Sequence, residues 1–487
     1  MNYITYSNTI IFGPKFNEEL DIELISGYEK IIFSDYELDE ILFERYANNN
    51  FDGLSNVKSK FNQNVSNLPP SITHLIFGHY FNQDVSKLPQ GLTHLTFGVR
   101  FNSDVSNLPP FLTHLTFGDG FNSDVISLPP FLTHLTFGDG FYSDVSNLPP
   151  TLTHLTFGSG FNQDVSNLPP TLTHLTFGLC FDKDVSKLPN SLTMINFNCR
   201  FNQNVSKLPN SITHLTFGRE FNQDVSKLPH NLIYLSLSGF AFNQDVSKLP
   251  PNLKHLTFGR EFNQDVSKLP QTLTHLIFGP FFNRDVSKLP PSLTYLTFGA
   301  GFNQDVSNLP HSITHLTFGD YFNKDVSKLP SHLTYLTFSS GSCFNQDVSN
   351  LPSSITHLTF GHHFNQDVSF LPSSITHLTF GEWFNQNSIP HGVEYLKLYC
   401  NNQHVIDCLP NSIKELELCM RKHFKIDNLP DSIKKLVIDA DCSYTKLNCL
   451  PDSVEELQLN KLYHVPITRI PSNLKKLICH ENYPHKN

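Results

Sequence analysis

Residues 81–100 read FNQDVSKLPQGLTHLTFGVR, and close variants of this phrase return every 20 residues along most of the chain. The phenylalanine that opens the phrase recurs without a slip at positions 61, 81, 101, 121, 141, 161, 181, 201 and 221. Where the period changes, the additional residues fall at the same place in the phrase, between Leu237 and Phe242 and between Phe338 and Phe344. Such an array predicts a solenoid whose insertions lie in surface loops.

Each unit contains a short alternating segment that predicts a β-strand. In the first clear example, Leu75 and Phe77 alternate with His74 and Ile76, so the first two side chains should point inward and the others outward. Because one unit cannot bury its apolar face alone, the strands of successive units should pair in parallel. We therefore predict a mostly β, leucine-rich-repeat-like repeat solenoid, with one parallel β-ribbon and short turns or 3-10 segments on the outer side.

The rest of each unit is predicted to close the coil. Gly78 directly follows the strand, where a left-handed or tight backbone conformation is least costly for glycine. Phe81 and Val85 should return inward to complete the core. Asn82 recurs in most units, and a row of amides is expected to form a hydrogen-bonded ladder between coils. Asp84 is expected to cap a short helical turn on the outer side.

The phrases FNQDV at residues 81–85 and LTHLTFG at residues 92–98 resemble the FNIP-repeat family, whose units are related to leucine-rich repeats. The resemblance covers nearly all of residues 61–400. It implies a repeat scaffold that is common in amoebae and in the large DNA viruses that infect them. Some members of that family carry an N-terminal F-box, but no F-box is seen here in residues 35–50.

The regularity of the array predicts three regions. Residues 1–60 are interpreted as degenerate N-terminal repeats that form a cap, residues 61–400 as tandem repeats of the 20-residue type, and residues 401–487 as degenerate leucine-rich-like repeats with a C-terminal cap. Residues 35–50 are predicted to be a short amphipathic helix or an irregular insertion. In the last region the outward Thr-His pairs become pairs of Lys and Glu, which alternate in sign and should pair laterally.

Composition disfavours several classes of partner. The formal net charge is −10 and no basic block is present, so nucleic-acid binding is not predicted. No apolar run is long enough to span a bilayer, and the start of the chain has no signal-peptide pattern. The nine cysteines form no Cys-x-x-Cys pair, as expected for reduced thiols. We therefore expect a cytoplasmic protein without membrane contact, in the host cytoplasm if the source is a virus.

A row of histidines is the most conspicuous chemical feature. The outward strand position holds His74, His94, His114, His134, His154, His174, His214, His255, His275, His315, His357 and His377. A straight row does not converge on one point as metal ligands do, and tyrosine replaces histidine in three units, so ring stacking is favoured over a metal site. Because Ser, His and Asp recur alike in every unit, no enzyme activity is predicted, and neither is a cofactor or a metal.

The two residues after each glycine vary between otherwise similar units, so folding does not dictate them. They define a candidate partner-binding rim, which comprises Tyr80, Arg100, Arg219, Arg260, Phe281, Tyr321, His362, His363, Glu382 and Trp383. Aromatic residues and arginine are typical of protein-recognition surfaces. Drift at unconstrained loop positions is the competing interpretation.

These observations predict a non-enzymatic protein–protein interaction scaffold whose partner and oligomeric state are left open. One alternative, suggested by the F-box members of the family, is a substrate-recognition subunit of a ubiquitin ligase. Another is a structural or decoy array without a single ligand, and a third is a metal-binding histidine row.

Overall fold

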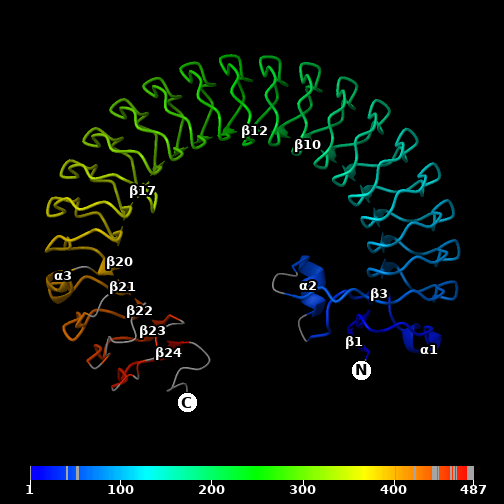
Figure 1. Cartoon of the computed structure of the whole chain (residues 1–487), viewed down its shortest axis with the longest axis horizontal. Coiled ribbons are helices and arrows are strands. Elements are labelled where there is room, and N and C mark those ends of the chain that lie inside the picture. The colour runs from blue at the N-terminus through cyan, green and yellow to red at the C-terminus, as the bar shows by residue number, and fades with distance from the viewer. Residues whose placement is uncertain are drawn as a thin grey trace. The chain divides into compact units, whose positions relative to one another are not determined.

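The computed structural model describes residues 2–39, 42–50, 54–400, 402–420, 424–440, 447, 449–460, 463, 465, 467 and 469–479. The chain forms two compact units, Met1–Gln244 and Asp245–Asn487. Each unit is a stack of coils, and each complete coil contributes one short strand to a β-ribbon (Figure 1). This confirms the predicted solenoid. The division into three regions by repeat regularity stays a prediction.

In the first unit, strand β1 runs antiparallel to β2, and the strands from β2 onward are parallel neighbours. The helices of this unit are α1 (Ile22–Ile25) and α2 (Leu42–Asn48). Its strands are β1 (Tyr3–Tyr6), β2 (Thr9–Phe12), β3 (Lys30–Phe33), β4 (His74–Ile76), β5 (His94–Thr96), β6 (His114–Thr116), β7 (His134–Thr136), β8 (His154–Thr156), β9 (His174–Thr176), β10 (Met194–Asn196), β11 (His214–Thr216) and β12 (Tyr234–Leu237).

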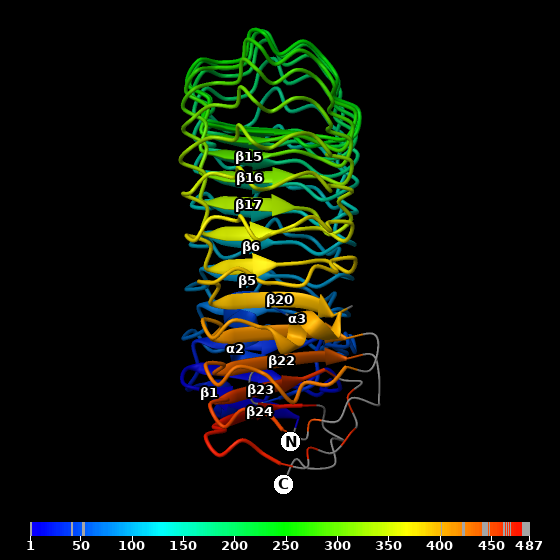
Figure 2. The ribbon, with the colours of Figure 1, turned by 90° about the vertical axis from the view of Figure 1, so that its left-hand side faces the viewer.

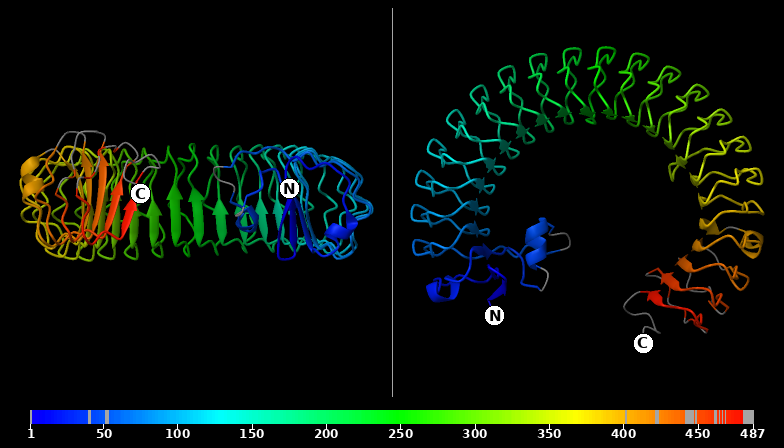
Figure 3. Two further views of the ribbon diagram at one scale, coloured as in Figure 1. Left: turned by 90° about the horizontal axis from the view of Figure 1, so that it is seen from below. Right: turned by 180° about the vertical axis from the view of Figure 1, so that it is seen from behind.

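The second unit continues the same coil pattern, again with parallel strands in sequence order (Figures 2 and 3). One helix, α3 (Gln403–Asp407), interrupts its described coils. Its strands are β13 (His255–Phe258), β14 (His275–Ile277), β15 (Tyr295–Thr297), β16 (His315–Phe318), β17 (Tyr335–Phe338), β18 (His357–Thr359), β19 (His377–Thr379), β20 (Tyr395–Cys400), β21 (Glu415–Met420), β22 (Lys435–Ala440), β23 (Glu456–Leu459) and β24 (Lys476–Ile478).

The core is a set of rows that run from coil to coil. Leu75, Phe77, Phe81, Val85 and Leu88 of one coil are all buried, as predicted. The rings of Phe77 and Phe81 stack with centroids 3.6 Å apart, so the strand and the returning segment meet across the coil. Because the same residues recur one coil later, each ring also packs on its equivalent in the next coil.

Close approach between coils accounts for the glycine after the strand. Of the two conformations predicted there, the left-handed one is wrong, because the glycine with positive φ among the described residues is Gly392, at φ 99°. A Cβ atom at Gly98 would lie 2.0 Å from the carbonyl oxygen of Gly78 in the preceding coil. Adjacent backbones therefore approach too closely at Gly98 for a side chain, although Asn198, Ser238 and Ser339 stand at the equivalent corner of other coils.

The asparagine ladder is confirmed. The backbone N–H of Asn102 donates to Oδ1 of Asn82 at 2.9 Å, and that of Asn122 donates to Oδ1 of Asn102 at 2.8 Å. An aspartate fits the same place, because Oδ1 of Asp182 accepts from the backbone N–H of Asn202 at 2.9 Å. Each ladder side chain thus accepts a hydrogen bond from a backbone N–H that forms no hydrogen bond within the β-ribbon.

In the regular coils the outer segment that contains Asp84 and its equivalents is a turn, so the helical turn predicted there is wrong. Oδ1 of Asp84 does accept from the backbone N–H of Ser86, at 2.9 Å, and Oδ2 accepts from the Ser86 hydroxyl at 3.0 Å. These bonds to Ser86 lower the pKa of the Asp84 carboxyl. The aspartate therefore closes an Asx turn rather than capping a helix.

At the N-terminal end, the predicted short helix is present as α2. Its Leu42 packs on Ile11 and Ile32, with Tyr46 against the same cluster. Ile11 and Ile32 stand at the outward positions of β2 and β3, where later strands carry polar residues. Helix α2 therefore covers the outward face of the first strands. The antiparallel strand β1 was not predicted.

Candidate functional site

The candidate rim is an ordered edge of each unit. The backbone N–H of Arg100 donates to the carbonyl of His79 in the preceding coil at 2.9 Å, and that of Trp383 donates to the carbonyl of His362 at 2.9 Å. Equivalent bonds recur along the rim. Its side chains are therefore presented at regular intervals by a hydrogen-bonded backbone, although the residues themselves vary.

In the first unit the structure pairs rim residues of neighbouring coils. The guanidinium of Arg100 lies 5.8 Å from the ring centroid of Tyr80, whose side chain is exposed. Arg219 lies 4.5 Å from the ring of Phe240, an exposed residue that the sequence analysis did not single out. Both contacts have the geometry of cation–π interactions. Phe240 could have been found in the sequence, because it is an aromatic residue at the rim position of the coil that follows Arg219.

In the second unit the same arrangement is found at Arg260. Arg260 lies 5.0 Å from the ring of Phe281, which is exposed. Tyr321 is also exposed on this rim. The binding roles of these residues stay a prediction, but the arginine–aromatic pairs hold large side chains in defined positions at the surface.

The densest group of candidate residues lies further along the second unit. The ring of His363 meets that of Trp383 edge to face, with centroids 4.2 Å apart and planes at 80°. Glu382 lies 3.8 Å from Nδ1 of His362. The side chain of Trp383 is 59% exposed, so the only tryptophan of the chain presents most of its surface to solvent.

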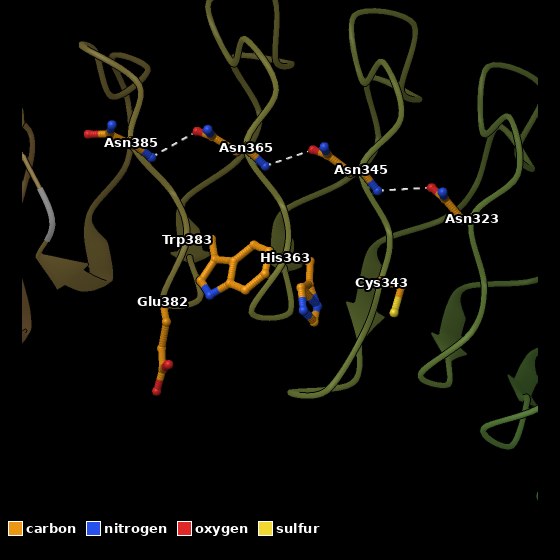
Figure 4. A pocket seen from close by; sticks show the side chains of 8 residues that line it. All are labelled: Asn323, Cys343, Asn345, His363, Asn365, Glu382, Trp383 and Asn385. Carbon is orange, nitrogen blue, oxygen red and sulfur yellow. Dashed lines mark hydrogen bonds between the residues drawn. The ribbon is translucent and has the colours of Figure 1, made fainter.

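This group borders an open hollow of about 810 Å³ (Figure 4). One side carries a row of ladder asparagines, and the other carries rim residues. The lining residues are Asn323, Cys343, Asn345, His363, Asn365, Glu382, Trp383 and Asn385. The structure thus brings together three predicted site residues with five that were not predicted. The sequence predicted the asparagines as a ladder, but only the fold shows that they also line this hollow.

The histidine row is stacked as predicted. The rings of His74 and His94 lie 4.1 Å apart, nearly parallel. Oγ1 of Thr93 lies 3.1 Å from the carbonyl of Thr73 and 2.9 Å from Nδ1 of His94. The Thr93 hydroxyl therefore lies between the preceding strand's carbonyl and the imidazole, and it holds the His94 ring in its stacked orientation.

Burial and the neighbouring His74 lower the pKa of His94 to about 4. The same causes lower the pKa values of His114, His134 and His154. Within the described ranges, no group of three or more His, Cys, Asp or Glu side chains is arranged to hold a metal ion. His94, His114, His134 and His154 are thus neutral, stacked rings near pH 7.

The last strands replace this stacked row by charged pairs, as predicted. Nζ of Lys435 lies 3.4 Å from Glu415, and Nζ of Lys476 lies 3.3 Å from Glu456. Glu417 accepts from Nζ of Lys397 at 2.6 Å. These pairs join neighbouring strands, and their exposure keeps each contribution small, typically below about 1 kcal/mol.

The fold and its surface define a repeat solenoid that resembles leucine-rich-repeat proteins. The FNIP Repeat model matches residues 61–98, 104–140, 144–180, 201–240, 242–281, 302–341, 344–382, 384–419 and 422–462. The chain belongs to the FNIP-repeat family. The matches extend beyond residue 400, where the Phe-Asn phrase is no longer recognisable by eye.

Among solved structures, the chain is similar to CroV588, described as a novel circular LRR protein structure. The identity is 32%, with 99% of this chain and 94% of that chain covered, and the TM-score is 0.58. It also matches InlJ from Listeria monocytogenes at 21% identity, covering 63% of this chain and 71% of that one, with a TM-score of 0.43. YopM from Yersinia enterocolitica matches at 18% identity, covering 86% and 91%, with a TM-score of 0.39. No curated protein matches the chain.

No helix in the part of the chain that the structure describes is long and apolar enough to cross a membrane.

Proposed function

We propose that the chain is a non-enzymatic protein-interaction scaffold that binds its partner on the rim around Trp383. The repeat solenoid supplies a rigid support in which each coil is braced by its neighbours. Variation concentrates at the rim, while the core, the ladder and the turns stay nearly constant. A surface that varies on a constant support suits selective recognition of another macromolecule.

One observation carries the proposal. Trp383 is 59% exposed, yet His363 packs against its ring edge to face and the backbone N–H of Trp383 is hydrogen-bonded to the preceding coil. An aromatic side chain that is exposed and already held in place loses little freedom on binding. Tryptophan is also enriched among residues that dominate interface energies.

The test compares two substitutions in capture experiments with lysate of the source cell. Trp383→Ala should weaken retention of a specific partner by at least about 1 kcal/mol, because it removes the anchor. Asp164→Asn should leave retention unchanged. Asparagine fits that turn, since Oδ1 of Asn204 accepts from the backbone N–H of Ser206 at 2.8 Å.

Quantitative mass spectrometry of the retained proteins gives the readout. A partner lost with Trp383→Ala and kept with Asp164→Asn supports the proposal. Equal losses with both variants, or no loss with either, would favour a structural array without a single ligand.

A further inference from the structure

Two of the four asparagines along the hollow, Asn323 and Asn365, have their side-chain oxygens fully occupied. Oδ1 of Asn323 accepts from the backbone N–H of Asn345 at 3.0 Å and from Nε2 of Gln346 at 3.0 Å. Oδ1 of Asn365 accepts from the backbone N–H of Asn385 at 2.8 Å and from Nε2 of Gln386 at 3.0 Å. A carbonyl oxygen has two lone pairs, so both of these oxygens are saturated.

The amide nitrogens of the same residues remain available. Among the described residues, Nδ2 of Asn323, Asn345, Asn365 and Asn385 donates no hydrogen bond to protein. Three of these side chains are exposed and Asn365 is half-buried. One wall of the hollow is therefore a row of N–H donors that recurs once per coil (Figure 4).

The opposite wall is aromatic and carries little charge. Nδ1 of His363 lies 3.3 Å from the carbonyl of Ser342, so the imidazole N–H is directed at that oxygen. Trp383 supplies a broad apolar surface beside it. Glu382 is the one charged residue among those that line the hollow, and none is Lys or Arg. Phosphates and other anions are disfavoured in such surroundings.

We propose that this hollow binds an extended polypeptide segment of the partner. Alternate carbonyl groups of the segment accept from the asparagine Nδ2 atoms, and an apolar side chain packs on Trp383. This inference deepens the proposed function and rests on it. It specifies the chemistry of the bound partner as a strand-like peptide, with no requirement for charged side chains.

The spacing of the coils supports an extended segment. The rings of Phe344 and Phe364, which directly precede Asn345 and Asn365, have centroids 6.0 Å apart. Carbonyls on one side of an extended chain repeat every two residues, roughly 6.6 Å. In a polyproline II helix the repeat is three residues, about 9.3 Å, which does not match. An α-helix uses its carbonyls internally and offers none.

A glycan is the competing occupant, since its hydroxyls can accept hydrogen bonds from amides. Hydroxyls also donate, however, and the saturated oxygens of Asn323 and Asn365 offer no acceptor at two of the four asparagine positions. Peptide carbonyls need only donors. The asparagine wall therefore fits the peptide better.

An isosteric variant separates the two roles of the asparagine. Asn365→Asp keeps an oxygen for the ladder but removes the Nδ2 donor. The chain already contains this arrangement, because Oδ1 of Asp182 accepts from the backbone N–H of Asn202 at 2.9 Å and from Nε2 of Gln203 at 3.0 Å. The matched control is Asn283→Asp, whose oxygen has the same two kinds of donor, outside the hollow.

The probe is a display library of random linear peptides, selected on the full chain. A length of about ten residues exceeds the roughly six that span four asparagines. Peptides that bind are then measured by fluorescence anisotropy. Trp383→Ala and Asn365→Asp should each weaken binding at least about fivefold. Asn283→Asp should change it less than about twofold.

The inference is overturned if no peptide is selected, or if selected peptides bind Asn365→Asp as well as the unchanged chain. Binding of arrayed glycans that both hollow variants abolish would identify a glycan as the occupant instead. If a partner captured from lysate depends on Trp383 but not on Asn365, the proposed interaction function stands. Only the inference of an extended peptide in the hollow is then overturned.

Discussion

Strands β13 to β19 and strands β20 to β24 of the second unit share one core but present different outward faces. In the first set, His and Tyr rings stack, as between His357 and His377 at 4.1 Å. In the second set, Lys and Glu pair across strands, as between Lys475 and Glu455 at 2.7 Å. Inward, both sets bury leucine in register, for example Leu358 and Leu436. The outward chemistry is therefore free to change while the inward row is not.

On both outward faces, each side chain must be compatible with its equivalent in the next strand. Parallel in-register strands place equivalent residues side by side, so like charges in successive strands would repel. One solution stacks aromatic rings along the row, and the other alternates the sign of the charge. The two regions should consequently share their response to core damage and differ in their response to pH and salt.

The largest expected effect is common to both regions. Leu358→Ala and Leu436→Ala should each reduce local stability by about 2 to 5 kcal/mol, because each leaves a cavity in a stacked core. Hydrogen exchange followed by mass spectrometry would show faster exchange in the mutated coil and its neighbours. A loss below about 1 kcal/mol in either region would mean that the shared core does not carry the stability there.

An intermediate effect should separate the regions by pH. Burial lowers the pKa values of His275, His315 and His357 below 6.5. The unfolded chain then binds more protons than the folded chain, so stability in β13 to β19 falls as the pH drops below 6.5. The Lys475 contact lowers the pKa of Glu455 below 4.5, so the charged strands should loosen only at more acidic pH.

Hydrogen exchange measured between pH 7 and pH 4, corrected for intrinsic rates, checks this order. His357→Tyr is the matched control, because Tyr335 already stacks on His357 at 4.2 Å in the same row. That variant should reduce the acid response of its coil without loosening it at neutral pH. An acid response confined to β20 to β24 would contradict the assignment.

The smallest expected effect separates the regions by salt. Exposed ion pairs contribute typically below about 1 kcal/mol each and are screened by salt. Raising the ionic strength should therefore speed exchange slightly in β21 to β24 and leave β13 to β19 unchanged. Glu455→Gln, which removes the partner of Lys434 and Lys475, should make its coil less sensitive to salt. Equal salt sensitivity in both regions would show that the charged row has no such role.

Much of the fold of this protein could be predicted from the sequence alone. The 20-residue period determined the solenoid, and alternation at Leu75 and Phe77 determined the inward rows. The recurrence of Asn82 determined the ladder, and the alternating Lys and Glu determined the lateral ion pairs. These features are predictable because a residue that repeats once per coil meets its own equivalent in the next coil.

Only the tertiary structure decided the features that join different positions of the repeat. It showed that Gly98 avoids a collision with Gly78, that the Thr93 hydroxyl contacts Nδ1 of His94, and that α2 covers the first strands. It also brought Trp383 and the ladder residue Asn365 to opposite sides of one hollow. The period specifies which equivalents align, but the path of the backbone within a coil determines which unlike side chains meet.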